Sequence, residues 1–336
     1  MEALATKYRP RTFKDVVCQD NVKRVLVNQL ETNQLKQAYL FTGSPGTGKT
    51  TSARILANDA NEGKGKPIEI DGASNNGVDN IRVIIDDCRM KSLNSKYKIY
   101  IIDECHMLST GAWNAFLKVL EEPPKGVIFI LCTTDPQKIP STILSRVQRF
   151  DFKRIPQQNI VDRLEYILVQ EGILTYNVEA IEYIAKLADG GMRDAIMKLD
   201  TVLGYTHEID MNNTLACLGV TSYDDMFKIV NSIIDRDATT AINVVERIFK
   251  DGKDLKLFTK DLGKCLLDLC KHNLTKTFDA TMIPPYMQRQ AIKLASLNIA
   301  DLVDILDGVN KIQDKIKYEQ YPKYLLESEL MLLCLL

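Results

Sequence analysis

Residues 43–50 read Gly43-Ser44-Pro45-Gly46-Thr47-Gly48-Lys49-Thr50. This stretch follows an apolar run at 38–41 and precedes a run at 51–57 with the spacing of a helix. Glycines between a strand and a helix let backbone N–H groups surround a phosphate, and the helix dipole adds to the attraction. We expect Lys49 to reach the β- and γ-phosphates and the Thr50 hydroxyl to hold a magnesium ion. The stretch therefore predicts a nucleotide-phosphate site, and a purely structural glycine-rich turn is the alternative.

Strand and helix signals alternate on both sides of this loop. We predict strands at 38–42, 68–71, 98–103, 127–133 and 148–152, with helices between them that include 78–90 and 110–121. Strands separated by helices predict a five-stranded parallel sheet with helices on both faces. In such sheets ligands bind at the carboxyl ends of the strands, where the loop at 43–50 falls.

Strand signals stop after residue 152. Helical spacing follows at 158–169, 178–187 and 193–203, which predicts a small lid domain, and then at 223–234, 238–249 and 255–270. The last stretch, 325–336, is apolar enough to be a buried helix. The sequence thus predicts an α/β nucleotide-binding domain at 1–153, a helical lid at 154–208 and an all-α domain at 209–336.

The bulk composition excludes several classes of protein. The chain has 336 residues, is 45% hydrophobic and 26% charged, and carries a net charge of −1, so no global field attracts DNA or a membrane. No apolar run approaches the roughly 18 residues of a membrane span, and no signal peptide is expected. The eight cysteines form no Cys-x-x-Cys pair, so we expect no zinc site and a reduced intracellular compartment.

Polar residues follow two of the predicted strands. Asp103 and Glu104 end the run at 99–102; Asp103 suits the magnesium shell, and Glu104 suits polarising the water that attacks a γ-phosphate. Thr133 and Thr134 end the next strand, where a hydroxyl can bind that water or the phosphate. The alternatives are solvated acids and threonines that satisfy backbone groups at the strand ends.

Two arginines are candidates for a catalytic role. Arg146 follows a short helix, and Arg193 opens a helix of the predicted lid. An arginine that enters a nucleotide site stabilises transition-state charge, by about 10³–10⁵ in rate. In isolation each suits a surface ion pair as well. His106 is expected to be structural, and Trp113 to pack in the core or against another subunit.

These motifs together resemble the bacterial DNA polymerase III gamma/tau family, the ATPases of sliding-clamp loaders in the AAA+ superfamily. The resemblance covers nearly the whole chain. Its specific parts are Lys7-Tyr8-Arg9-Pro10, the loop at 43–50, residues 69–82, 102–109 and 116–124, and Thr133-Thr134-Asp135-Pro136.

The resemblance implies a role for each matching residue. Asp103 and Glu104 match the acid motif, Thr134 a sensor, Arg146 a residue that acts on the ATP of the adjacent subunit, and Arg193 one that contacts the γ-phosphate in its own subunit. Arg82 resembles a position that touches the DNA backbone. The implied ATP-binding residues are Tyr8, Arg9, Pro10, Val16, Val17, Gly43, Ser44, Pro45, Gly46, Thr47, Gly48, Lys49, Thr50, Thr51 and Arg193.

The sequence departs from the family in three ways. Residues 58–67 hold no cysteine where bacterial relatives carry a four-cysteine zinc module, and Val147 replaces the cysteine after Ser145-Arg146. The third departure is that the chain stops at the third domain, without the tau-type extension. We therefore expect ATP and Mg²⁺ as cofactors but no zinc. The trimmed form suggests a bacteriophage or another compact replisome.

The resemblance also implies partners. They are other clamp-loader subunits in a ring, typically a pentamer, a sliding clamp, and primer–template DNA held by its backbone. No membrane is expected, and the compartment is the bacterial cytoplasm, or the host cytoplasm for a phage protein. Two alternatives stay open: a loader subunit that holds nucleotide without hydrolysing it, and another AAA+ DNA motor such as a branch-migration helicase.

Overall fold

The computed structural model describes residues 2–90, 94–218, 222–279 and 281–335. The chain divides into two compact units. Unit 1 comprises residues 1–174 and 184–200, and unit 2 comprises residues 175–183 and 201–336. Among the described residues, no helix has both the length and the apolar character needed to cross a membrane.

Unit 1 is built on a parallel sheet. Its strands are β1 (Ala38–Gly43), β2 (Ile68–Asp71), β3 (Lys98–Asp103), β4 (Val127–Thr133) and β5 (Gln148–Phe152). They lie in the order β2-β3-β4-β1-β5, and every pair is parallel. All five predicted strands are confirmed, and β1 is one residue longer than expected.

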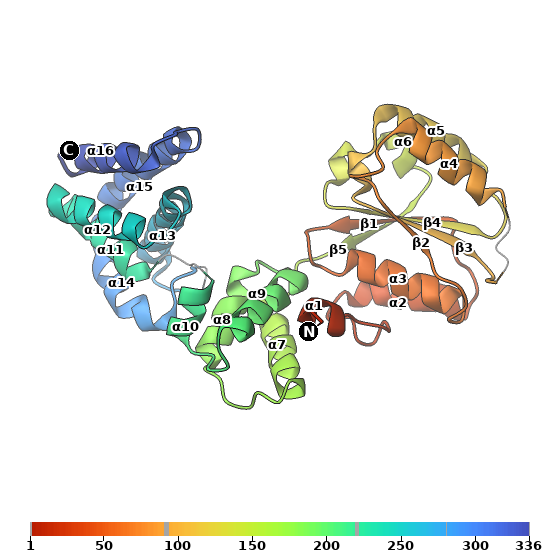
Figure 1. Ribbon diagram of the computed structural model, residues 1–336, viewed down its shortest axis with the longest axis horizontal. Helices are drawn as coiled ribbons and strands as arrows, with labels where there is room; N and C mark the ends of the chain where they lie inside the picture. The colour runs from red at the N-terminus through yellow and green to blue at the C-terminus, as the bar shows by residue number, and fades with distance from the viewer. Residues whose placement is uncertain (1, 91–93, 219–221, 280, 336) are drawn as a thin grey trace. The chain divides into compact units, whose positions relative to one another are not determined.

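Helices cover both faces of this sheet (Figure 1). The helices that precede β5 in the chain are α1 (Leu4–Lys7), α2 (Asp20–Glu31), α3 (Lys49–Ala60), α4 (Val78–Cys88), α5 (Thr110–Glu121) and α6 (Ser141–Leu144). Short 3₁₀ turns are formed by η1 (Cys105–Met107) and η2 (Pro136–Lys138). The predicted helix at 110–121 is confirmed, whereas the one predicted at 78–90 ends at Cys88.

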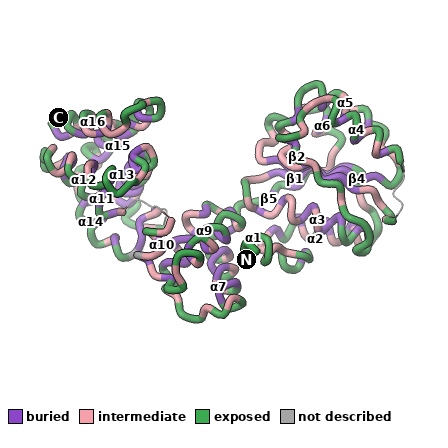
Figure 2. The backbone as a smooth tube through the Cα atoms, viewed as in Figure 1, coloured by how far each residue is buried: buried purple, intermediate pink, exposed green. Residues whose placement is uncertain are grey.

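The alternation of side chains along the strands produces two hydrophobic layers. Leu40 packs with residues of α4, α5 and α6, whereas Tyr39 and Phe41 pack with residues of α2 and α3. Every residue of β4 is buried, and Figure 2 shows the central strands as buried backbone. A sheet covered on both faces accounts for the near-continuous apolar runs of its strands.

Gly43 ends β1 at a position where only glycine fits. Its φ is +144°, and a Cβ atom there would lie 2.3 Å from the Phe152 carbonyl oxygen of β5. The chain then turns through Gly46 and Gly48, both at positive φ, before α3 begins at Lys49. The predicted order of strand, glycine-rich loop and helix is therefore confirmed.

Three helices follow β5 at the predicted places. They are α7 (Gln157–Gln170), α8 (Val178–Leu187) and α9 (Met192–Tyr205). The division between the two units falls within α8 and within α9. The three-domain organisation with boundaries at 153 and 208 stays a prediction.

In the part of unit 2 that the structure describes, the regular elements are helices and one isolated bridge between Tyr176 and Ile209. They are α10 (Met211–Cys217), α11 (Tyr223–Ile234), α12 (Ala238–Lys250), α13 (Leu255–Thr275), η3 (Pro285–Met287), α14 (Gln288–Ala295), α15 (Ile299–Ile316) and α16 (Pro322–Leu335). Pro322 is the first residue of α16, a position where the missing N–H costs nothing. The expectation of a buried last helix holds for one face only: Leu326 and Leu330 are buried, and Leu332 is exposed.

Candidate nucleotide site

In the loop between β1 and α3, the side chain of a buried lysine is hydrogen-bonded to backbone carbonyl groups of the loop. Lys49 is 6% exposed, and its Nζ donates to the carbonyls of Gly43 at 2.7 Å and Ser44 at 2.8 Å. Thr47 Oγ1 also donates to Ser44, at 2.8 Å. Burial lowers the pKa of Lys49, because it disfavours the charged form. An anion in the loop would oppose this shift by favouring the charged form, and it would accept hydrogen bonds from the ammonium in place of the two carbonyls.

Thr50 and Asp103 lie together although β4 separates β1 from β3 in the sheet. Thr50 Oγ1 donates to Asp103 Oδ2 at 2.8 Å. A hydroxyl and a carboxylate oxygen are the hard ligands that Mg²⁺ takes from a protein when phosphates and waters supply the rest. Among the described residues, no group of three or more His, Cys, Asp or Glu side chains is close enough to hold a metal alone. The pair therefore fits a magnesium ion that arrives with a nucleotide.

Glu104 is held in place by the neighbouring strand end. Thr134 Oγ1 donates to Glu104 Oε2 at 3.0 Å, and His106 Nδ1 lies 3.3 Å from the same oxygen. His106 Nδ1 is also 3.0 Å from Thr133 Oγ1, in agreement with the hydrogen-bonded structural role expected of it. Glu104 itself has φ +45°, a conformation that non-glycine residues adopt at a cost. The carboxylate is thus oriented from two sides.

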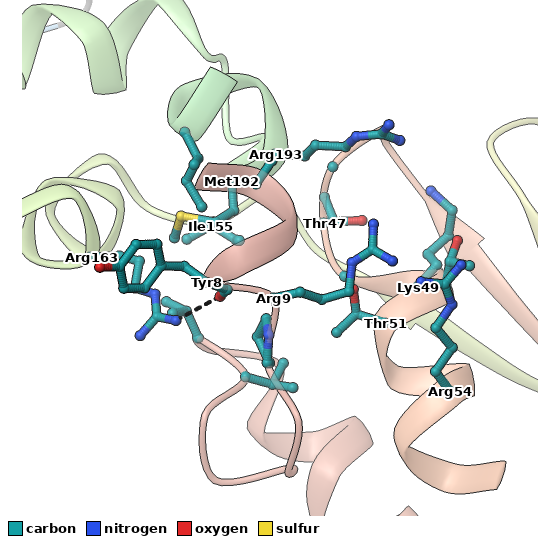
Figure 3. Close-up of a pocket in the computed structure, with 18 of the residues that line it drawn as sticks. Tyr8, Arg9, Thr47, Lys49, Thr51, Arg54, Ile155, Arg163, Met192 and Arg193 are labelled. Atoms are coloured by element: carbon teal, nitrogen blue, oxygen red, sulfur yellow. Dashed lines mark hydrogen bonds between the residues drawn. The ribbon is translucent and has the colours of Figure 1, made fainter. Parts of the chain in front are cut away.

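A cavity of about 290 Å³ opens beside the loop (Figure 3). The predicted site residues that line it are Tyr8, Arg9, Pro10, Val16, Val17, Gly46, Thr47, Gly48, Lys49, Thr50, Thr51, Asp103 and Arg193. Sequence reasoning missed Ala5, Arg54, Ile155, Arg163, Met192 and Ile196. The missed residues are mostly apolar or basic side chains on helices and in a linker, where no motif marks them.

The cationic character of this cavity favours an anionic ligand. Figure 3 shows Arg9 reaching across it toward Thr47 and Thr51, while Tyr8 is turned toward Arg163. Five basic side chains line the space, from Arg9, Lys49, Arg54, Arg163 and Arg193, against the single carboxylate of Asp103. This excess of positive charge suits a triphosphate.

The N-terminal wall of the cavity is attached to α7 and α9. Arg163 Nη2 of α7 donates to the Tyr8 carbonyl at 2.9 Å, as the dashed line in Figure 3 shows. The hydroxyl of Tyr8 donates to Glu171, and Lys7 Nζ donates to the same carboxylate at 2.7 Å. The Leu4 N–H donates to Asp200 Oδ2 at 3.1 Å. Residues 4–8 are therefore positioned by the helices that follow the sheet, and not by the sheet itself.

A second cavity of about 440 Å³ adjoins the loop on the side of Glu104. It is lined by Ser44, Pro45, Gly46, Lys49, Thr50, Asp103, Glu104, Arg154, Ala188, Asp189, Gly191, Arg193, Asp194 and Met197. Arg193 and Lys49 line both cavities. Gly46 lies so close to the start of α9 that a Cβ on it would be 3.2 Å from the Gly191 Cα. The loop and the turn before α9 thus form one wall.

Four predicted site residues line neither cavity. Gly43 accepts from Lys49 and Thr134 donates to Glu104, so these two contact lining residues, whereas Arg146 and Arg82 have other partners. Arg146 donates to the Thr142 carbonyl at 2.7 Å and to Glu121 Oε1 at 2.9 Å. Arg82 is exposed and pairs with Asp79 at 3.0 Å. The roles predicted for them, on the ATP of a neighbour and on DNA, stay predictions. Trp113 is 3% exposed and packs edge-on against Phe116, so it is part of the core.

Two family models match consecutive parts of the chain. Residues 67–156 match the model described as DNA polymerase III, delta subunit. Residues 159–206 match the model of the ATPase lid domain of the DNA polymerase III clamp loader subunit. The second match spans most of α7 and all of α8 and α9, and α7 and α9 contribute residues to the lining of the first cavity.

Curated proteins match over more of the chain. DNA polymerase III subunit tau of Bacillus subtilis is 36% identical over an alignment of 356 positions. The alignment covers 99% of this chain and 63% of that protein. The tau subunit of Escherichia coli is 35% identical over 75% of this chain and 42% of its own length. The gamma/tau subunit of Mycoplasma genitalium is 31% identical, over 82% and 51%. The chain thus spans about half the length of these relatives.

Solved structures agree on the fold. The Holliday junction branch migration motor RuvB of Thermotoga maritima superimposes with a TM-score of 0.53 at 20% identity, over 68% of this chain and 79% of that one. Likeness at this identity concerns the architecture alone, which is a parallel sheet followed by helices. The sequence matches place the chain, over the residues that it spans, in the family of bacterial DNA polymerase III gamma/tau subunits.

Proposed function

We propose that this protein is an ATP-hydrolysing motor subunit of a sliding-clamp loader, which uses ATP to open a clamp and load it onto primer–template DNA. The observation that supports this most directly is the phosphate loop itself: a buried Lys49 and the pair Thr50–Asp103 converge on one space with an oriented Glu104. The names of the relatives in DNA polymerase III supply the biological setting.

The proposed mechanism gives each side chain one task. Lys49 exchanges its carbonyl partners for the β- and γ-phosphates, and the loop amides hold the same oxygens. Glu104, oriented by Thr134, accepts hydrogen bonds from the attacking water. Mg²⁺ bound at Thr50 and Asp103 would neutralise charge on the phosphate oxygens. Arg193, which lines both cavities, stabilises the γ-phosphate from the same chain.

Arg146 is proposed to serve a neighbouring subunit. Its guanidinium is engaged with Glu121 and lines neither cavity of its own chain. An arginine that reaches the ATP of the next protomer would tie nucleotide state to assembly, because ATP then favours the arrangement in which both subunits contact it. We propose a ring of clamp-loader subunits, with residues 154–208 as lid and 209–336 as collar, acting in the bacterial cytoplasm.

The test is the ATPase rate with and without clamp and primed DNA. We expect clamp and DNA to stimulate the assembly that contains this chain, and Glu104→Gln and Arg146→Ala to lower the rate by about 10²-fold or more. Lys138→Ala, an exposed cation on η2 that pairs with Asp135, is the control expected to retain the rate. Unchanged rates in both site variants would contradict the hydrolytic assignment and favour a nucleotide-holding scaffold.

A branch-migration motor, the other DNA motor that the sequence left open, is the second candidate, and the chain shares its architecture with one such motor. The two functions differ in their requirement for a clamp. A motor of that kind would hydrolyse ATP on branched DNA without a clamp protein, whereas the proposed loader subunit responds to clamp and primed DNA together. Stimulation by branched DNA alone would therefore favour the second candidate.

A further inference from the structure

Gln19 joins the phosphate loop to the linker that leads from the sheet into the following helices. It is 8% exposed and lies at the residue before α2. Its Nε2 donates to the Lys153 carbonyl at 2.7 Å, and its Oε1 accepts from the Lys153 N–H at 3.1 Å. The same Nε2 lies 3.4 Å from the carbonyl of Thr47 in the loop. One side chain therefore contacts both segments.

Gln19 breaks the usual pattern for the start of a helix. Residues at this position normally accept from the helix N–H groups with a short Ser, Thr, Asp or Asn side chain. Gln19 makes no such bond, and both it and Cys18 have positive φ, at 60° and 56°. A short polar residue with extended backbone at this position would therefore stabilise α2 better than Gln19 does. Departures of this kind concentrate at functional positions.

Lys153 begins a short path to the predicted γ-phosphate arginine. The next residue, Arg154, pairs with Asp189, and the Ile155 N–H donates to the Gly190 carbonyl at 3.1 Å. Gly191 lies against Gly46 of the loop, two residues before Arg193. The linker is thus tied to the loop through Gln19 at one end and to the turn before α9 at the other.

We propose that Gln19 is a positioning residue that couples occupancy of the phosphate loop to the linker and so to Arg193. The amide suits this task because it offers a donor and an acceptor in one plane, as a neighbouring strand would, and keeps a second N–H for Thr47. When a nucleotide reorganises the loop, the Thr47 carbonyl and the linker move as one body. This inference rests on the proposed nucleotide binding at residues 43–50.

The test is hydrogen exchange of the full chain with and without the non-hydrolysable ATP analogue AMP-PNP, together with ATPase kinetics. In the wild type we expect the analogue to protect both the loop, 43–50, and the linker, 153–156. In Gln19→Met the loop stays protected, whereas protection of the linker and kcat both fall about fivefold or more, with a smaller change in KM. A purely structural role would lower stability without separating these readouts.

Gln29→Met is the matched control. Gln29 is another buried glutamine of the same region, also 8% exposed, but it bonds to Gln148 and Tyr39 and contacts neither loop nor linker. We expect it to lower stability and leave the linker response unchanged. Gln19→Asn, which keeps the amide on a shorter arm, replaces Gln19→Met if that variant does not fold. Full linker protection in the Gln19 variant would overturn this inference alone; a wild type without any protection would overturn the proposed function as well.

Discussion

The buried polar groups at the phosphate loop of unit 1 differ in their surroundings from those between the helices of unit 2. In unit 1 the buried Lys49 and Thr47 face a cavity and bond to the carbonyls of a loop. In unit 2 the buried Asp268 accepts from the Met282 N–H at 2.6 Å and pairs with Lys271. Asp225, 7% exposed, pairs with Arg247. A buried polar group that faces a cavity is available to bind a ligand. One that is enclosed between helices stabilises the packing of those helices through its hydrogen bonds.

This difference predicts which property each substitution will change. Removing a polar group that faces the cavity should impair nucleotide binding or hydrolysis and cost little stability. Removing an enclosed one should cost stability and leave the chemistry alone. The single tryptophan, Trp113, lies in unit 1, so its fluorescence follows the unfolding of that unit, while far-ultraviolet circular dichroism follows both.

The largest effect is expected from Lys49→Ala. Because the lysine is the central cation of the loop, its loss should lower the ATPase rate by about 10²-fold or more. The matched control is Lys98→Ala. Lys98 is the first residue of β3, at the opposite end of that strand from Asp103, and it is also largely buried and pairs with Asp87 at 2.8 Å. Steady-state ATPase assays measure the effect, and equal rates for the two variants would contradict the distinction between polar groups that face the cavity and polar groups that are enclosed.

Asp268→Ala should give the next effect, on stability. The substitution leaves the Met282 N–H without its acceptor, which costs about 1–3 kcal/mol in the free energy of unfolding. Urea denaturation should show an earlier transition by circular dichroism and an unchanged midpoint for Trp113 fluorescence. Asp307→Ala is the control, because that exposed aspartate pairs only at the surface of α15. A fall in ATPase rate with unchanged stability would contradict the comparison.

The same difference explains how much was predictable from the sequence. The five strands and the phosphate loop were readable because their polar residues stand out at the ends of apolar runs, as at Asp103 and Thr134. Helix ends were less accurate: the helix predicted at 255–270 continues to Thr275, where Lys276 adopts positive φ. Hydrophobic periodicity does not encode where a helix stops.

Arg163 was missed as a site residue, and Gln19 was expected only as the end of a segment around the adenine, for a related reason. Each acts on the backbone of a segment far along the chain, Gln19 on Lys153 and Arg163 on Tyr8. Such contacts have no spacing or residue pattern of their own, and they exist only once the chain has folded. The one available signal was a glutamine at the start of a helix, where shorter polar residues are usual.

Arg163→Ala should have a moderate effect on nucleotide binding. Its bond to the Tyr8 carbonyl fixes the wall opposite the loop, so its loss should raise the KM for ATP about fivefold, equivalent to about 1 kcal/mol. Arg149→Ala, on β5 and paired with Asp151, is the control and should not change KM. If Arg163→Ala lowered kcat at constant KM, the wall would not be a binding element.

The smallest effect is the pH dependence of the contact between Glu171 and the N-terminal segment. Hydrogen bonds from Lys7 and Tyr8 lower the pKa of Glu171, and the bond to Glu171 raises the pKa of Lys7. A depressed carboxyl pKa means that the contact is complete above the ordinary value of about 4.3 and is lost as pH falls through the folded value. A raised lysine pKa means that it is also lost at alkaline pH, as Lys7 deprotonates.

The ratio of AMP-PNP affinities between wild type and Glu171→Gln isolates this contact, since other titrating groups affect both proteins alike. We expect the ratio to favour the wild type by a few-fold at most and to stay constant across neutral pH. It should approach unity below about pH 4, because protonated Glu171 then resembles glutamine. Glu165→Gln, on the same helix α7, should give a ratio near unity throughout. A ratio for Glu171→Gln that rises on acidification would show that the carboxylate does not stabilise the N-terminal wall of the cavity. The contact at the end of α7 would then make no contribution to nucleotide binding.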